Sequence, residues 1–208
     1  ARYGALAFSI GGYGYVGTGY NDNYLKDFYR FDPNAATGQQ WTIVSGFGGY
    51  KRQYGTAFVI DDVAYICCGD NNGTLVDDLW KFDGSDWKQL RDIANNDSDE
   101  DYDDDYAITR AGTVSFVIDG RGYIATGTRS GVTSDYWVYD PEEDLWYGDS
   151  DDDYTPMTNV HNVSSGGSSR SYAVSFSTGK RGFVLSGSSG TSYFDDVYEL
   201  LPYEQEDV

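Results

Sequence analysis

Short apolar stretches alternate with polar turns along the whole chain, and one order of positions occurs four times. In residues 110–146, Phe116 follows Arg110 by six positions, and Gly127 follows Phe116 by eleven. The same spacing occurs in Arg2–Phe8–Gly19, Arg52–Phe58–Gly69 and Arg170–Phe176–Gly187. Internal repeats of roughly 40–60 residues are typical of propellers and solenoids. The sequence therefore predicts one repeated architecture rather than a set of unrelated domains.

Each repeat begins with two predicted strands joined by a tight turn. The predicted first strands are Ala5–Ile10, Thr56–Ile60, Thr113–Ile118 and Ala173–Ser177. The turns that follow them are Gly11-Gly12, Asp61-Asp62, Asp119-Gly120 and Thr178-Gly179. Glycine and aspartate tolerate the positive φ angles of tight hairpins, so we expect antiparallel pairing across each turn. The second strand then reaches a small residue followed by Gly19, Gly69, Gly127 or Gly187.

A third and a fourth strand complete the predicted unit. The third carries an aromatic or apolar pair directly after Asp27, Asp78, Asp135 or Asp196. An outer strand is marked by Trp41, Trp87 and Trp146 in the first three repeats. The fourth repeat has only Tyr203 and an acidic tail after Pro202, and therefore lacks this strand.

Residues 1–208 are therefore predicted to form an all-β fold. Helical periodicity is sustained nowhere, and a four-stranded meander buries both faces only by stacking on its neighbours. We predict a β-propeller built of four-stranded antiparallel blades. The blades cover approximately residues 2–45, 52–92, 110–148 and 170–203, with acidic insertions at 93–109 and 149–169.

These motifs resemble the kelch repeat, the unit of kelch-type propellers and of the galactose-oxidase-like central domain. The resemblance rests on the glycine step, the aromatic after aspartate and the outer tryptophan, and it covers nearly the whole chain. Kelch units usually carry two adjacent glycines, whereas the first place here belongs to Thr18, Cys68, Thr126 and Ser186. Kelch propellers usually close with more than four blades. The chain is thus either part of a larger propeller or is completed by strands from elsewhere.

The charge of the chain excludes several classes of partner. The formal net charge is −20, and eleven of the carboxylates lie in two clusters within residues 97–105 and 149–153. A nucleic-acid ligand requires a basic surface, and so does an anionic membrane face. No apolar run is long enough to span a bilayer. We therefore expect no nucleic-acid partner and no direct membrane insertion.

The candidate binding residues are the arginines that begin the four repeats: Arg2, Arg52, Arg110 and Arg170. The resemblance implies that they surround the mouth of the central channel, where arginines of kelch propellers hold ligand carboxylates. A guanidinium group suits this role because it binds a carboxylate through two parallel hydrogen bonds. The alternative is architectural: each arginine pairs with an aspartate or a carbonyl of the fold. Recurrence in every repeat favours the architectural role.

Candidate catalytic and metal chemistry is limited by the residue inventory. The copper-radical chemistry of galactose oxidase needs two imidazoles, and His161 is the only histidine. Cys67 and Cys68 are adjacent and are interpreted as two buried free thiols of one strand. We expect no cofactor; calcium held by the alternating aspartates of residues 97–105 is the alternative.

These observations favour a non-enzymatic recognition module that binds a protein or a glycan on its loop-rich face. Tyr13, Tyr20, Tyr24 and Tyr50 are candidates for stacking on such a ligand. The alternatives are a hydrolase, lyase or epimerase acting on sugars, and a structural subunit that packs against a membrane-anchored partner. The wording of the glycine-rich turns also resembles kelch-containing surface proteins of Bacteroidetes-type bacteria. That resemblance implies an extracytoplasmic location, either secreted or on the cell surface as an outer-membrane-associated lipoprotein.

Overall fold

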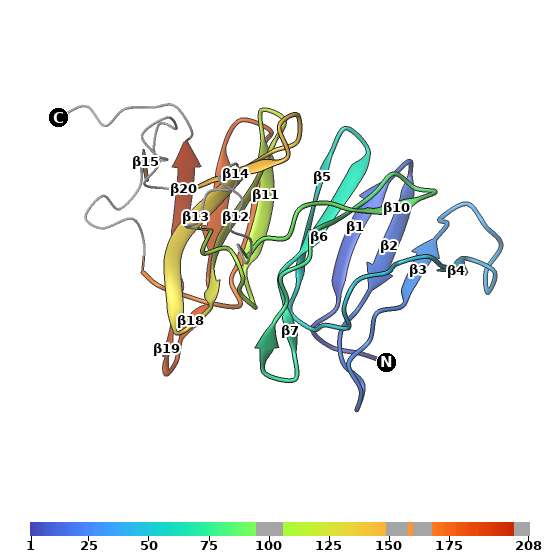
Figure 1. Ribbon diagram of the computed structural model, residues 1–208, viewed down its shortest axis with the longest axis horizontal. Helices are drawn as coiled ribbons and strands as arrows, with labels where there is room; N and C mark the ends of the chain where they lie inside the picture. The colour runs from blue at the N-terminus through green and yellow to red at the C-terminus, as the bar shows by residue number, and fades with distance from the viewer. Residues whose placement is uncertain (95–105, 149–157, 160–167, 202–208) are drawn as a thin grey trace. The chain divides into compact units, whose positions relative to one another are not determined.

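The computed structural model describes residues 1–94, 106–148, 158–159 and 168–201. Within these ranges the chain is all-β and contains no helix, and therefore no helix able to cross a membrane. Its main elements are four four-stranded antiparallel sheets, the four blades of a β-propeller (Figure 1). The predicted fold class is confirmed. The chain divides into two compact units, Ala1–Ala111 and Gly112–Val208, and each contains two of the sheets.

The first unit contains two meanders, each with its strands paired in sequence order. The first sheet consists of β1 (Leu6–Ile10), β2 (Tyr13–Gly17), β3 (Phe28–Phe31) and β4 (Trp41–Val44). The second consists of β5 (Thr56–Ile60), β6 (Val63–Cys67), β9 (Trp80–Phe82) and β10 (Trp87–Gln89). A separate two-stranded ribbon joins β6 to β9 and consists of β7 (Asp70–Asn71) and β8 (Thr74–Leu75).

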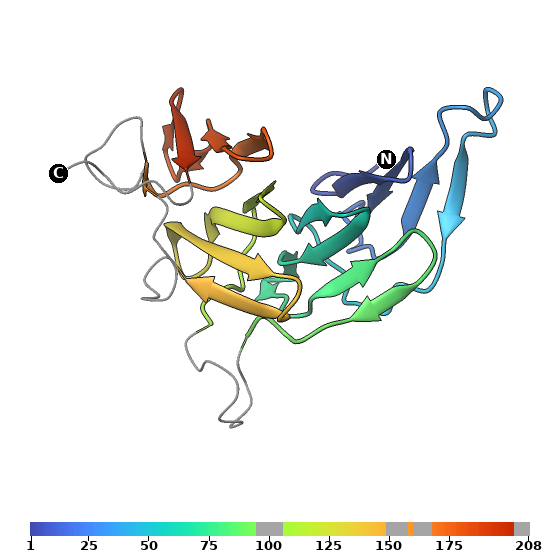
Figure 2. The same cartoon turned by 90° about the horizontal axis from the view of Figure 1, so that it is seen from above.

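The second unit repeats this plan with one change. Its first sheet consists of β11 (Val114–Ile118), β12 (Arg121–Thr128), β13 (Val132–Asp140) and β14 (Leu145–Gly148). Its second sheet contains β16 (Val174–Ser177), β17 (Gly182–Leu185) and β20 (Val197–Leu201), with a ribbon of β18 (Ser188–Ser189) and β19 (Ser192–Tyr193) before β20. The outer strand of this sheet is β15 (Thr158–Asn159), which pairs with β20. The chain before the repeat thus supplies the outer strand that its sequence lacks (Figure 2).

Aromatic side chains form the core of the first unit. Phe8 stacks on Tyr15 at 5.0 Å, and both rings contact Phe82 of the neighbouring sheet at 6.4 and 5.4 Å. These three side chains are at most 9% exposed. Burial of each ring stabilises the fold by roughly 1.5–3 kcal/mol relative to an exposed ring. The inner-strand phenylalanine of one sheet therefore packs directly on the next sheet.

The tight turns between the first two strands behave as their residue types predict. Both central residues have positive φ in the turns at Gly11-Gly12, Asp61-Asp62 and Asp119-Gly120. In the fourth turn only Gly179 has positive φ, and Thr178 N donates to Arg181 O at 2.9 Å. A two-residue hairpin with positive φ at both positions matches the twist of the strands it joins.

Candidate functional site

The four predicted arginines lie beside the first strand of each repeat, where their side chains bond within the fold. Arg52, Arg110 and Arg170 are at most 1% exposed. In each of these three the Nε atom donates to a backbone carbonyl two residues earlier. The acceptors are Tyr50 O at 3.2 Å, Ile108 O at 2.9 Å and Ser168 O at 3.1 Å.

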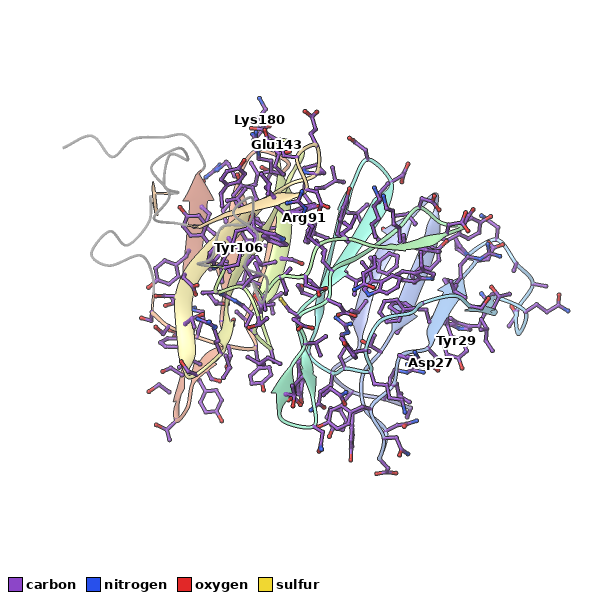
Figure 3. All side chains as sticks on the ribbon, in the orientation of Figure 1. Asp27, Tyr29, Arg91, Tyr106, Glu143 and Lys180 are labelled. Atoms are coloured by element: carbon purple, nitrogen blue, oxygen red, sulfur yellow. The ribbon has the colours of Figure 1, made fainter. Side chains whose placement is uncertain are left out.

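The aspartate before the aromatic pair is the acidic partner of Arg2, Arg52 and Arg170. Arg2 donates to both carboxylate oxygens of Asp27 at 2.8 and 2.9 Å (Asp27 is labelled in Figure 3). Arg170 makes the same two bonds to Asp196 at 2.5 and 2.9 Å, and Arg52 pairs with Asp78. The hydrogen bonds from the arginines hold the pKa values of the Asp27 and Asp196 carboxyls below the usual value. This pairing is the geometry that the architectural role predicts.

The backbone of the same arginines joins neighbouring repeats. Gly19 N donates to Arg52 O, Gly69 N to Arg110 O and Gly127 N to Arg170 O, each at 2.7 Å. The guanidinium groups reach the residue before the glycine of their own repeat: Arg2 donates to Thr18 O at 2.7 Å, and Arg170 donates to Ser186 O at 2.8 Å. The backbone and the side chain of one arginine thus bond to the glycine segments of two neighbouring repeats. Binding of a ligand by Arg2, Arg52, Arg110 and Arg170 stays a prediction.

Cys67 and Cys68 are both buried free thiols, as the sequence predicts, but only Cys67 lies in a strand because β6 ends there. Cys68 occupies one of the left-handed positions before the glycine, with φ of 62°. Hydrogen bonding to Cys68 together with burial raises the pKa of the Cys67 thiol. Both side chains are 0% exposed. Cys67 is therefore protonated, poorly accessible and a poor candidate nucleophile.

A cluster of tyrosine rings lies on one surface of the first unit. We use the term tyrosine cluster for Tyr3, Tyr20, Tyr24 and Tyr54. The Tyr3 ring lies 5.5 Å from the Tyr20 ring and 6.3 Å from the Tyr54 ring, and Tyr20 lies 5.0 Å from Tyr24. Tyr3 is 56% exposed, and the other three are partly buried. The cluster therefore presents aromatic surface to solvent in a fixed arrangement.

Two polar side chains adjoin the tyrosine cluster. Asp70 accepts hydrogen bonds from the Tyr24 hydroxyl at 3.3 Å and from Gln53 Nε2 at 3.4 Å, while its second oxygen accepts from Gly73 N at 2.7 Å. Burial and the Asp70 charge raise the pKa of Tyr24. The Oε1 atom of Gln53 is buried and has no hydrogen-bond partner among the described residues. A buried amide oxygen without a partner is a rare feature of a folded protein.

The backbone holds the cluster in place. Tyr3 and Tyr20 exchange two backbone hydrogen bonds at 3.1 and 2.9 Å, and Gln53 and Asp70 exchange two at 2.9 Å. Tyr54 has φ of 56°, a left-handed conformation that is uncommon for a bulky residue. The equivalent positions of the other repeats, Gly4, Gly112 and Tyr172, also have positive φ, so this conformation belongs to the repeated fold. The tyrosine cluster is thus a preorganised surface rather than a set of independent side chains.

Sequence reasoning identified part of this site. Tyr20 and Tyr24 belong to the cluster, whereas Tyr13 lies under the Arg30 guanidinium at 4.6 Å in β2. Tyr50 is 59% exposed. Tyr3, Gln53, Tyr54 and Asp70 were missed by the sequence analysis. A usable signal existed: the residue after each repeat arginine pairs with the residue after the glycine, so Tyr3 meets Tyr20 and Gln53 meets Asp70.

The remaining sequence predictions fall largely outside the described part of the chain. Three of them lie outside the described residues: His161, the aspartates of residues 97–105 and the second acidic cluster at 149–153. The alternative of a calcium site rests on the first of these acidic clusters. Within the described ranges no group of three His, Cys, Asp or Glu side chains is arranged to hold a metal ion.

Comparisons with known proteins support the fold and leave the activity open. No protein-family model matches the sequence, and no curated protein matches it. Among solved structures, 181 chains match. One of these is the structure of YjhT, with a TM-score of 0.71 and 17% sequence identity over 98% of this chain. The chain spans 62% of the length of that structure. At this identity the likeness shows the propeller fold alone.

Proposed function

We propose that this propeller is a recognition module and that the tyrosine cluster is its binding surface. The observation that carries the proposal is four tyrosine rings held next to Asp70 and the unpartnered Gln53 oxygen. Binding surfaces are enriched in tyrosine because its ring offers a rigid apolar face and its hydroxyl a polar handle. The surface is asymmetric: Ala111 and Ser171 hold the places of Tyr3 and Gln53 in the third and fourth repeats.

The chemistry of the cluster favours a neutral glycan. Tyrosine rings pack against the C–H face of a sugar ring, and the adjoining polar atoms are mainly acceptors for sugar hydroxyl groups. The partly exposed acceptor is the Asp70 carboxylate, which lies beside the Gln53 side chain with its buried Oε1 atom. The net charge of −20 disfavours an anionic ligand at this site. A secreted or cell-surface location, with a membrane-anchored partner, belongs to the same proposal and is supported by the sequence resemblance.

The test is a screen of immobilised neutral glycans, followed by calorimetric titration with the best soluble oligosaccharide. We expect Tyr3→Ala and Tyr20→Ala to weaken binding by at least about tenfold, since loss of a stacking ring costs roughly 1–3 kcal/mol. The matched control is Tyr193→Ala, because Tyr193 is 86% exposed in β19 of the other unit. Retention of no glycan, or equal affinity of all three variants, would contradict the proposal. Binding of a protein by the same residues would support the recognition role and contradict the choice of a glycan as the ligand.

A further inference from the structure

The sheet formed by β16, β17 and β20 has one apolar face that is exposed. Directly paired residues of antiparallel strands share a face, so the register places five apolar residues on one side: Val174, Leu185 and Val197 together with Phe176 and Phe183. The buried Glu199 pairs with Phe183 on the same side and forms an ion pair with Arg181. Val174 is 57% exposed, Phe176 51% and Val197 51%. We call these five residues the fourth-sheet face. Phe176 and Phe183 stack on it at 4.6 Å.

The equivalent phenylalanine is buried in every other repeat. Phe8, Phe58 and Phe116 are 9%, 4% and 5% exposed. Within the first unit, Phe8 packs in one cluster with Ala64 and Phe82 of the next sheet. Within the second unit, a Cβ atom added to Gly182 would lie 2.3 Å from the Phe116 ring, so the ring sits directly on that glycine. An inner-strand phenylalanine therefore requires a neighbouring sheet that offers a small residue at this place.

The first sheet offers such a surface. Register places Ser9, Gly14, Phe31 and Trp41 on one face, with Ala7, Val16, Tyr29 and Ile43 beside them. We call these eight residues the first-sheet face. Gly14 holds the place of Ala64 and Gly182, since each pairs with the fourth residue of the first strand. Trp41 and Ile43 are 54% and 71% exposed.

The aromatic residues of the first-sheet face match those that cover Phe8. In the second sheet, Phe82 stacks on Trp87 at 4.4 Å and contacts Phe8. In the first sheet, Phe31 and Trp41 hold the same two paired places and lie 5.0 Å apart. The Phe31–Trp41 pair is thus shaped to cover an inner-strand phenylalanine.

A polar contact follows the same rule. Ser177 Oγ donates to Val117 O of the preceding inner strand at 2.7 Å. The equivalent residue of the first strand is Val117 in the third repeat, Ser177 in the fourth and Ser9 in the first. Each of them pairs with a glycine of the second strand: Gly122, Gly182 and Gly14. Ser9 is exposed in β1. Its hydroxyl is therefore placed to donate to Ser177 O when the first-sheet face covers the fourth-sheet face.

We infer that the fourth-sheet face of one copy binds the first-sheet face of a second copy, by the contacts that join successive sheets within each unit. This contact is heterologous: it uses two different surfaces, so it either closes into a ring or continues into longer assemblies. Three half-exposed apolar side chains on one face and two on the other give it a hydrophobic driving force.

Sedimentation velocity of the whole 208-residue chain tests the contact from about 1 μM to about 1 mM. We expect concentration-dependent association that Phe176→Asp, Val174→Lys and Gly14→Glu each weaken at least about tenfold. Gly14 accommodates a side chain within its own sheet, because an added Cβ would meet only Phe31 Cβ at 3.7 Å. Tyr193→Ala is the control and leaves the association unchanged.

Mixing distinguishes this contact from any symmetric dimer. Phe176→Asp retains an intact first-sheet face, and Gly14→Glu retains an intact fourth-sheet face. Each variant alone is expected to be monomeric, whereas an equimolar mixture forms a 1:1 dimer and nothing larger. Circular dichroism confirms that each variant keeps its strands. A wild-type monomer at every concentration would overturn the inference. Association that none of the three variants weakens would overturn it as well.

Discussion

Arg52 illustrates how one side chain can join two repeats. Its carbonyl accepts from Gly19 N at 2.7 Å, and its guanidinium donates to Cys68 O at 3.2 Å and pairs with Asp78. Both members of that ion pair are at most 2% exposed. A buried charge that loses its partner keeps its full desolvation cost, so such a pair is sensitive to the loss of either side chain.

We predict that Arg52→Met lowers the free energy of unfolding by about 3–5 kcal/mol, because Asp78 would remain buried without its cation. The control is Arg2→Ala. The Arg2 and Asp27 side chains are 19% and 40% exposed, and loss of a pair in this setting costs about 0–1 kcal/mol. Urea denaturation measures both values. Equal and small losses would contradict the architectural role of Arg52.

At Thr18 we predict a substitution that increases the stability of the fold. Thr18 has φ of 59°, and its buried hydroxyl has no hydrogen-bond partner among the described residues. Thr18→Gly removes both the left-handed strain and the unpartnered hydroxyl, while it adds backbone entropy to the unfolded chain. We expect the free energy of unfolding to rise by about 1 kcal/mol. Ser9→Gly is the control: Ser9 lies in regular strand, so glycine should be destabilising there. A lower melting temperature for Thr18→Gly would contradict the strain argument.

Asp196 provides a prediction on pH. Its folded-state pKa is lowered, first by the hydrogen bond from Arg170. The pair therefore contributes stability above the unfolded pKa of about 4 and loses it as pH falls through the lower folded value. We compare wild type with Asp196→Asn by urea denaturation between pH 7 and pH 2. The stability difference should be constant above about pH 5 and shrink below pH 4. A difference independent of pH would show that Asp196 is not held ionised by Arg170.

At the scale of the elements, spacing was sufficient to predict the strands. The first strands agree with the sequence analysis to within one residue, since Thr56–Ile60 is identical and Val114–Ile118 differs only at Thr113. Most second strands end two residues early. β2 ends at Gly17 because Thr18 turns into the left-handed region, and β6 ends at Cys67 for the same reason at Cys68. Residue type alone did not indicate that Thr or Cys would adopt a conformation favoured by glycine.

Two other features required long-range information. The strand β15 pairs with β20 from a segment before its repeat, and no local pattern in Thr158–Asn159 signals this. The tyrosine cluster depends on contacts between neighbouring repeats, as in the Tyr3–Tyr54 ring contact and the hydrogen bond from Tyr24 to Asp70. The repeat spacing was visible in the sequence, but the partners across repeats become clear only once the blades are stacked. Local signals thus predict the blade, and cross-repeat contacts determine the site.

At the scale of the whole molecule, the net charge of −20 separates the two proposed contacts. Copies of a strongly acidic chain repel each other, and this repulsion opposes the contact between the first-sheet and fourth-sheet faces. Raising the ionic strength from about 0.01 M to about 0.15 M shortens the Debye length from about 30 Å to about 8 Å. A neutral glycan carries no charge, so its binding to the tyrosine cluster should not respond to this change.

We therefore predict that added salt strengthens self-association and leaves glycan affinity within about twofold. Sedimentation velocity and calorimetry on the same preparation, at both ionic strengths, measure the two effects. Phe176→Asp should remove the salt response of the sedimentation coefficient and preserve glycan binding, because Phe176 lies in β16 of the second unit, away in sequence from Tyr3 and Tyr20. Weaker self-association in salt would mean that charge pairs rather than apolar rings hold the copies together. Loss of glycan binding in salt would contradict recognition of a neutral ligand by the tyrosine rings.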